Sequence, residues 1–193
     1  DHPIKSTYLI HKANFVACHN PAYIGKYDMV EDLVDGGTFL LNCGWDMAEI
    51  EKRLPDKDKK YIADHNIQFY TIDGIKIGRE IGLGGRINTV LQSAFFKLAN
   101  IIPADQAADY MKAAAKASYG KKGDKIVQMN YDAIDRGADG LVKIEVPASW
   151  KNATGEHKLP VAEGGRKEVV DFVNNILIPS PHQHGNELPV SAF

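Results

Sequence analysis

The fold of this chain is decided by the short apolar run Thr38-Phe39-Leu40-Leu41-Asn42. The run lacks a clean alternation of apolar and polar residues, which is typical of a strand that is covered on both faces. Similar runs occur elsewhere in the sequence: STYLI at 6–10, NFVAC at 14–18 and IQFYTI at 67–72. We therefore predict that these four runs lie in one mainly parallel sheet.

Helical patterns lie between these runs. Tyr27, Val30 and Leu33 recur at helical spacing before two glycines, and they predict a crossover helix of about ten residues. Strand, helix and strand would then form a right-handed βαβ unit. Two further helices are expected before 67–72, one through Met47 and one that starts at Pro55. The predicted fold class is α/β, with three layers and a mainly parallel sheet flanked by helices.

The sequence after Asp73 predicts a helical part and then an extended C-terminal connector. Helices are expected before the glycine cluster at 82–85, from Asn88, after Pro103 and through Ile126, with Gly137 to Gly140 loosening the end of the last one. From Pro147 the chain is rich in Gly, Pro, His and Asn, apart from a helical island at 167–176. We predict an α/β domain at 1–146 and a connector at 147–193, with few contacts between them outside that island.

Composition excludes several classes of function. The 193 residues carry 23 basic and 25 acidic side chains, for a net charge of −2, and no block of like charges. This balance argues against a nucleic-acid surface and against an electrostatic membrane anchor. No apolar run approaches the ~20 residues that span a bilayer, and the N-terminus does not read as a signal peptide. We therefore expect a cytoplasmic protein that contacts neither nucleic acid nor membrane.

The cysteines and histidines offer little metal chemistry. Cys18 and Cys43 each lie in or just after a strand-like run, where reduced buried thiols are favoured over a disulfide. Zinc and iron–sulfur sites usually need several thiolates and a close C-x-x-C pair, which two separated cysteines cannot supply. His182 and His184 form the only close histidine pair and are expected to be surface residues. We expect no metal site in this segment.

The segment Gly82-Leu83-Gly84-Gly85-Arg86 allows two interpretations. It begins as a dinucleotide fingerprint, but Ile87 occupies the place of the third glycine and a helix precedes it, so a nicotinamide site is disfavoured. A helix that begins near Asn88, beside Arg86, could hold a phosphate. Alternatively, the glycines form a close-packed corner in which Arg86 pairs with a carboxylate, and the sequence alone favours this second interpretation.

Lys5 and Ser6 offer an ammonium and a hydroxyl that suit a phosphate, although such residues at a strand edge are commonly only solvated. No G-x-S-x-G, H-E-x-x-H or Walker pattern occurs. Nothing in the sequence assembles a nucleophile, a base and an oxyanion hole. The residues therefore indicate an α/β domain without self-sufficient chemistry.

A family resemblance covers nearly the whole chain. It rests on PIKSTYLI at 3–10, NPAYIGKYDMVEDLVDGGTFLLN at 20–42, IGLGGRINTVLQSAFFKLANIIP at 81–103 and LPVSAF at 188–193. These stretches closely resemble the gamma-type domain, domain III, of pyruvate:ferredoxin (flavodoxin) oxidoreductase. In that family the domain has a further strand and helix upstream, so the resemblance implies a partial domain. The closing LPVSAF resembles the link toward the ferredoxin-type cluster domain.

The resemblance implies a segment of an enzyme of anaerobic metabolism that decarboxylates pyruvate oxidatively to acetyl-CoA and CO2. Thiamine diphosphate and [4Fe-4S] clusters would lie in other domains, coenzyme A would be the co-substrate, and ferredoxin or flavodoxin would accept the electrons. The complete enzyme would be a homodimer in the cytoplasm, or in a hydrogenosome-like organelle of an anaerobic eukaryote. An alternative is a non-catalytic interaction domain of an oxidoreductase for another 2-oxo acid.

The resemblance also implies the role of this segment. It is expected to be structural and to border the coenzyme A site, with no catalytic residue of its own, and to be inactive when isolated. The candidate contacts to coenzyme A are Lys5, Ser6, Gly84, Gly85, Arg86 and Asn88.

Overall fold

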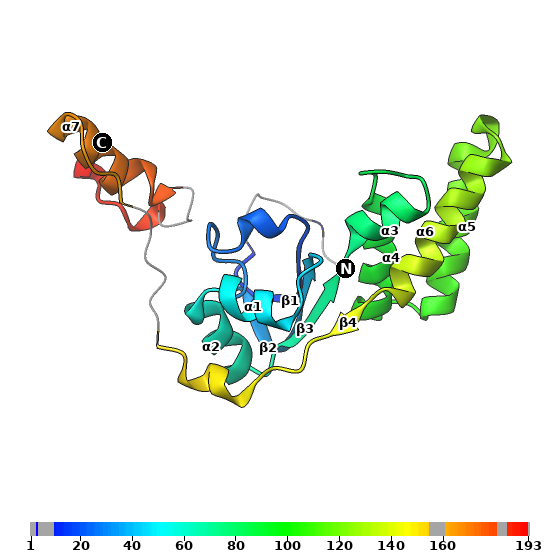
Figure 1. Cartoon of the computed structure of the whole chain (residues 1–193), viewed down its shortest axis with the longest axis horizontal. Coiled ribbons are helices and arrows are strands. Elements are labelled where there is room, and N and C mark those ends of the chain that lie inside the picture. Colours follow the sequence, from blue (N-terminus) through cyan, green and yellow to red (C-terminus); the bar gives the residue numbers. More distant parts are fainter. Residues whose placement is uncertain (1–2, 4–9, 155–160, 181–184, 193) are drawn as a thin grey trace.

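The computed structural model describes residues 3, 10–154, 161–180 and 185–192. A four-stranded sheet lies at its centre, with the strands in the order β1 (Ala13–Cys18), β2 (Leu33–Asn42), β3 (Gln68–Ile72) and β4 (Val142–Lys143). The first three strands are parallel, and β4 is antiparallel to β3 (Figure 1). The sheet confirms the predicted α/β class and the three runs at 14–18, 38–42 and 67–72. The run at 6–10 falls almost entirely outside the described residues.

Helices cover the sheet on both faces. The helices before β3 are α1 (Met47–Arg53) and α2 (Asp56–Asp64), and the later ones are α3 (Gly74–Glu80), α4 (Asn88–Ala99), α5 (Ala104–Tyr119) and α6 (Asp124–Asp139). The Asp46 carboxylate caps α1 by accepting from the Glu49 N–H at 2.8 Å. Asn66, with a φ of 53°, follows the end of α2. The predicted helices in these regions are confirmed, because caps and apolar spacing are local signals.

The predicted crossover helix between β1 and β2 is wrong. Only a 3-10 turn, η1 (Pro21–Tyr23), occurs there, and the Ala22 N–H donates to Asn20 Oδ1 at 3.0 Å. Leu33 already belongs to β2, whose pairing with β1 is interrupted between Ala13 and Phe15. Gly36, with a φ of 73°, lies in this irregular stretch and does not end a helix. The apolar spacing is satisfied by Val30 in a loop and Leu33 at the start of a strand, which are both buried.

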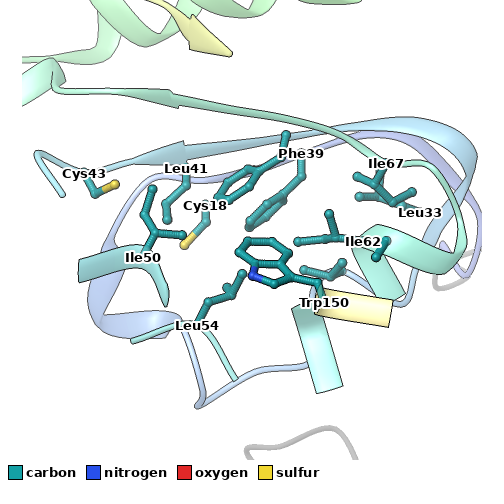
Figure 2. Close-up of a cluster of buried hydrophobic side chains, with 13 residues drawn as sticks. Cys18, Leu33, Phe39, Leu41, Cys43, Ile50, Leu54, Ile62, Ile67 and Trp150 are labelled. Atoms are coloured by element: carbon teal, nitrogen blue, oxygen red, sulfur yellow. The ribbon is translucent and has the colours of Figure 1, made fainter. Parts of the chain in front are cut away.

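Two buried clusters fill the space between the three layers. Figure 2 shows the cluster beside α1 and α2, in which Phe39, Leu41 and Phe69 of the sheet meet Ile50 and other side chains. The opposite face buries Leu40 and Ile72 against side chains of α3, α4 and α6, including Ile77, Val90 and Ala133. Because Phe39, Leu40 and Leu41 point alternately to two buried faces, the central strand carries no polar alternation.

The expectation of few contacts between the tail and the domain is wrong for the first residues of the tail, which pack against α2. Trp150, in the 3-10 helix η3 (Ala148–Asn152), is 1% exposed and lies in the cluster of Figure 2, with its ring centroid 6.4 Å from that of Phe69. Its Nε1–H donates to Glu51 Oε2 at 2.6 Å, and Lys60 Nζ donates to the Lys151 carbonyl at 3.0 Å. A single large apolar side chain decides this packing despite the polar composition around it. The division at 146/147 itself stays a prediction.

The helical island at 167–176 is present as α7 (Lys167–Phe172) followed by a π-helical stretch, Val173–Leu177. Figure 1 shows α7 away from the sheet. The π-helical stretch that follows α7 contacts the segment before α7 through Asn174. The Ala162 N–H donates to Asn174 Oδ1 at 2.8 Å, and the Ala162 carbonyl accepts from Asn174 Nδ2 at 3.1 Å. The tail therefore contacts the α/β unit through Trp150, whereas the sequence analysis expected the helical island to make these contacts.

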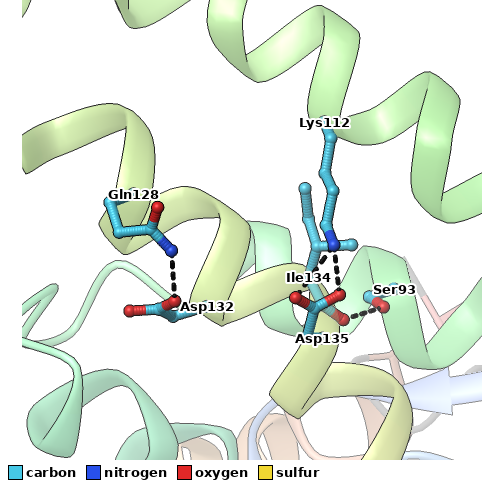
Figure 3. Close-up of polar contacts among 6 residues, drawn as sticks. All are labelled: Ser93, Lys112, Gln128, Asp132, Ile134 and Asp135. Atoms are coloured by element: carbon cyan, nitrogen blue, oxygen red, sulfur yellow. Dashed lines mark hydrogen bonds and ion pairs between the residues drawn. The ribbon is translucent and has the colours of Figure 1, made fainter. Parts of the chain in front are cut away.

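Helices α4, α5 and α6 form a bundle beside the sheet. Figure 3 shows Ser93 of α4 donating to the Ile134 carbonyl of α6 at 2.5 Å, and Lys112 of α5 paired with Asp135 of α6 at 2.7 Å. Helix α6 ends at Asp139 with Gly140 as its C-cap residue, inside the range 137–140 where its end was predicted, but it remains helical through Gly137. A Cβ at residue 137 would lie 2.4 Å from the Val90 carbonyl oxygen. The glycine instead allows α6 to touch α4.

Candidate functional site

The glycine cluster closes α3 and leads into α4. The Leu83 and Gly84 N–H groups both donate to the Gly78 carbonyl, at 2.8 and 3.0 Å. Gly82 and Gly84 have φ values of 84° and 61°, in the left-handed region that favours glycine. A Cβ at residue 78 would lie 2.6 Å from the Gly84 carbonyl oxygen. Close packing at this corner therefore occurs between residues 78 and 84.

The outer side of the same corner is open. Gly84, Gly85 and Arg86 are exposed, and a Cβ at Gly84 or Gly85 would meet no atom within 4 Å. The Arg86 side chain makes no ion pair or hydrogen bond with the part of the chain that the structure describes. The carboxylate partner that the packing interpretation requires is therefore missing among the described residues. Backbone and guanidinium both remain accessible to a ligand.

The N-terminus of α4 is the third component of this corner. Ile87 occupies the N-cap position without a side-chain cap, and the first turn contains no acidic residue. The first amides of the helix, which begins at the exposed Asn88, thus have neither intrahelical nor side-chain acceptors. Free N–H groups at the positive end of the helix dipole attract anions. These backbone N–H groups, the side-chain amide of Asn88 and the guanidinium of Arg86 can together hold a phosphate.

A pocket lies next to this corner, where the three parallel strands end. It has a volume of about 360 Å³, and we call it the strand-end pocket; it is lined by His19, Asn20, Pro21, Asn42, Cys43, Gly44, Asp73, Ile75 and Ile87. Ile87 belongs both to this pocket and to the N-cap of α4. The sequence analysis missed the pocket, although polar residues directly after each strand were a signal for it.

The buried side chain of Asn42 holds the strand-end pocket together. Only 3% of Asn42 is exposed. Its Nδ2 donates to the His19 carbonyl at 2.8 Å, and its Oδ1 accepts from the Gly74 N–H at 2.9 Å. One amide therefore joins the loops that follow β1 and β3 to the end of β2, so the walls are positioned before any ligand arrives.

Both cysteines are free, buried thiols, as predicted. Burial raises the pKa of Cys18 to about 11, although its hydrogen bond to the Asn20 carbonyl, at 3.1 Å, opposes the rise. Burial likewise raises the pKa of Cys43. Thiols with raised pKa values stay protonated at neutral pH and are poor nucleophiles or metal ligands.

The remaining predicted sites are limited by what the structure describes. Lys5, Ser6, His182 and His184 lie outside the described residues. Within the described ranges, no group of three or more His, Cys, Asp and Glu side chains is placed to hold a metal ion. In the same part of the chain, no helix has the length and apolar character needed to cross a membrane. Gly84, Gly85, Arg86 and Asn88 are brought together at one corner.

These features define the class of protein: a layered α/β domain with a ligand-sized pocket at the carboxyl ends of its parallel strands. Residues 1–140 match the family model described as pyruvate ferredoxin/flavodoxin oxidoreductase, and the chain belongs to this family. The resemblance found in the sequence is thereby confirmed.

Three similar proteins illustrate the relationship. The chain is 47% identical over 191 residues to pyruvate:ferredoxin oxidoreductase of Moorella thermoacetica, covering 99% of this chain and 16% of that protein. It is 48% identical over 193 residues to pyruvate-flavodoxin oxidoreductase of Klebsiella pneumoniae, covering all of this chain and 16% of the relative. It is 41% identical over 213 residues to pyruvate dehydrogenase [NADP(+)] of Cryptosporidium parvum, covering 99% of this chain and 11% of that protein. The chain thus spans a small part of each relative.

A solved structure supports the fold. The chain superposes on pyruvate oxidoreductase subunit PORC of Thermotoga maritima with a TM-score of 0.56 and 17% sequence identity, over 70% of this chain and 67% of that subunit. At this identity the likeness shows a shared fold alone.

Proposed function

We propose that this chain is a segment of a pyruvate:ferredoxin (flavodoxin) oxidoreductase, which converts pyruvate and coenzyme A to acetyl-CoA and CO2 and reduces ferredoxin or flavodoxin. Family membership and the 16% share of the relatives support this proposal. The names of the three relatives described above include pyruvate, which favours it over another 2-oxo acid as the substrate.

The chemistry of the complete enzyme belongs to other domains under this proposal. Thiamine diphosphate and [4Fe-4S] clusters would be bound there, and the complete enzyme would be a cytoplasmic homodimer. The two buried thiols, whose pKa values are raised, agree with a structural role for this segment. We expect it to support the assembly and to border the coenzyme A site.

The observation that carries the coenzyme A proposal is the open corner at the start of α4. Coenzyme A has phosphates, which need cations and N–H donors, and a backbone without side chains lets them approach closely. Arg86 has no partner among the described residues, α4 has no side-chain cap, and Gly84 and Gly85 are exposed. Asn88 adds an amide at the same place, and Lys5 and Ser6 are the additional candidates.

The test compares Lys5→Ala and Arg86→Ala, made separately in the full-length enzyme. A charged contact to phosphate contributes about 1.5 to 3 kcal/mol, so each loss should raise the Michaelis constant for coenzyme A roughly tenfold or more. The Michaelis constant for pyruvate should not change. Arg53→Ala serves as the control, because it removes the same charge from α1, where Arg53 pairs with Glu49. If neither of the first two variants weakens coenzyme A selectively, the corner serves packing alone.

A further inference from the structure

The chain between β4 and η3 crosses the amino-terminal end of β3, at the edge of the sheet opposite the strand-end pocket. We call residues 144–149 the crossing segment; Figure 1 shows it running from β4 toward η3 beside α2. Ile144 and Val146 pack against the buried cluster of Figure 2, and Trp150, directly after the segment, lies inside that cluster. The crossing segment is therefore anchored to the domain along its length.

A pocket of about 380 Å³ lies between the crossing segment, the end of α2 and the start of β3, and we call it the β3–β4 pocket. Ile62 and Phe69, both fully buried, supply apolar surface to its wall. The exposed side chains of Lys143, Glu145 and Lys151 supply charges at its rim. Pockets that combine apolar surface with a few polar groups are typical of sites for small organic ligands.

The β3–β4 pocket opens where the pairing of the two strands stops. The Ile144 N–H donates to the Phe69 carbonyl at 2.9 Å. Two residues further along this antiparallel ladder, the next bond would join the Val146 N–H to the Ile67 carbonyl. That bond is not formed, and no described residue donates to the Ile67 carbonyl or accepts from the Val146 N–H. Because Ile67 is only 2% exposed, its carbonyl is a shielded acceptor that a donor inside the pocket can satisfy.

The rim of the pocket carries unpaired charges of both signs. Within the described ranges, the ammonium groups of Lys143 and Lys151 form no ion pair, and the Glu145 carboxylate accepts no hydrogen bond. By contrast, the lysines of the neighbouring helix α2 all pair with carboxylates. A ligand with one positive and one negative group would meet an opposite charge at each.

These features select a class of ligand. The Ile67 carbonyl needs a donor, the Val146 N–H needs an acceptor, and the rim offers an anion and two cations. A free α-amino acid carries an ammonium group and a carboxylate on one carbon atom, so it supplies donor, acceptor and both charges together. A simple amine lacks the acceptor, and a simple carboxylate lacks the donor. The buried apolar wall favours an apolar side chain on the same molecule.

We propose that the β3–β4 pocket binds a free α-amino acid with an apolar side chain. The ammonium group of the ligand lies between the Ile67 carbonyl and Glu145. Its carboxylate lies between the Val146 N–H and the two lysines of the rim, and its side chain contacts Ile62 and Phe69. This site goes beyond the proposed function and does not rest on the coenzyme A contacts.

The probe is L-leucine, and its dissociation constant is measured by calorimetry on the full-length enzyme. Two analogues share its apolar side chain: 4-methylpentanoate lacks the amino group, and 3-methylbutylamine lacks the carboxylate. Each analogue should bind at least about tenfold more weakly than leucine, because each leaves one charged hydrogen bond unmade.

Three variants test the position of the site. Glu145→Gln removes the anion, and Lys143→Gln combined with Lys151→Gln removes both cations; each should raise the dissociation constant of leucine about tenfold. Ala148→Phe adds bulk at an exposed position of the pocket wall and should weaken binding without changing a charge. All four positions are exposed, so the variants should fold. Lys121→Gln combined with Lys122→Gln removes two exposed charges from η2 (Gly120–Lys122) and is the matched control.

The outcomes decide the inference independently of the coenzyme A proposal. Leucine binding that weakens in the three pocket variants but not in the control, together with weaker binding of both analogues, supports it. Leucine binding that is unchanged in the pocket variants places the ligand elsewhere and overturns the inference. Analogues that bind as tightly as leucine, or an effect of Ala148→Phe without an effect of the charge variants, indicate an apolar cleft without amino-acid recognition and also overturn it. A dissociation constant for leucine above about 10 mM would do the same.

Discussion

A carboxylate buried at the start of α2 should make the stability of this chain depend on pH. Asp58 is 6% exposed, and none of the described residues donates a hydrogen bond to its carboxylate. Burial is the largest cause of its raised pKa, and the charges of Asp28 and Glu31 raise it further, to about 7. Lys57 opposes the rise, but its Nζ is shared with Asp28 and Glu31, at 3.3 and 2.9 Å.

The sign and size of the effect follow from this pKa. In the unfolded chain the carboxyl group of Asp58 ionises near its ordinary pKa of 3.8, whereas in the folded chain it does so at about 7. Below the lower value both states are protonated, and the group costs nothing. Between the two values the free energy of unfolding falls as pH rises, by about 1.4 kcal/mol per unit. Above pH 7 the full cost, on the order of 4 kcal/mol, is present.

The perturbation is Asp58→Asn, which keeps the shape and removes the charge. Urea denaturation should show the variant to be more stable than the unmodified chain by about 2 to 4 kcal/mol near pH 8. The difference should shrink to less than about 1 kcal/mol near pH 4 and vanish at lower pH, where the aspartate is protonated in both states. Asp64→Asn is the matched control, because this exposed aspartate of the same helix pairs with the exposed Lys60 at 3.1 Å, and its loss should cost less than about 1 kcal/mol. A gain that persists unchanged at the lower pH, or no gain at the higher one, would refute the reasoning.

Three further predictions concern packing and chemistry. Trp150→Ala should lower the free energy of unfolding by about 3 to 5 kcal/mol in urea denaturation, whereas Trp45→Ala, at a half-buried position, should cost clearly less. A loss of less than about 1 kcal/mol in Trp150→Ala would mean that the tail does not stabilise the core. Gly137→Ala should lower the melting temperature because its Cβ would overlap the Val90 carbonyl, while Gly85→Ala, in open space, should have little effect in the same calorimetric scan. The purified 193-residue chain should show neither iron–sulfur absorbance nor pyruvate oxidation, and turnover by it would contradict the proposed segment role.

The coarse fold was readable from the sequence because its signals are local. Consecutive residues of the central run at 38–42 are apolar, so the sequence predicts that both faces of this strand are covered, whichever elements cover them. Asp46 and Pro103 mark helix starts through their own backbone and side-chain preferences. The glycine corner, with Arg86 and Asn88, was visible as a candidate anion site for the same reason.

The features that the sequence analysis missed depend on residues far apart in the chain. The spacing of Val30 and Leu33 suits a helix, but their burial is achieved by a loop and a strand that pairs with β1. Gly137 was predicted to help loosen the end of its helix, but in the structure it lets α6 approach the Val90 carbonyl of α4. The two-residue strand β4 exists only because β3 offers it a free edge.

The sequence by itself indicated the family through its resemblance to known members, and it indicated the layered α/β class because apolar period and spacing are properties of the chain alone. It also shows none of the common catalytic motifs. Only the tertiary structure decided that Trp150 completes the core and that Asn42 joins the ends of three strands into a pocket beside α4. These contacts are distant in sequence: Asn42 to His19 spans 23 residues, Gly74 to Asn42 spans 32, and Trp150 to Glu51 spans 99. Such contacts form only when the sheet brings distant residues together, and no local pattern encodes which of them will meet.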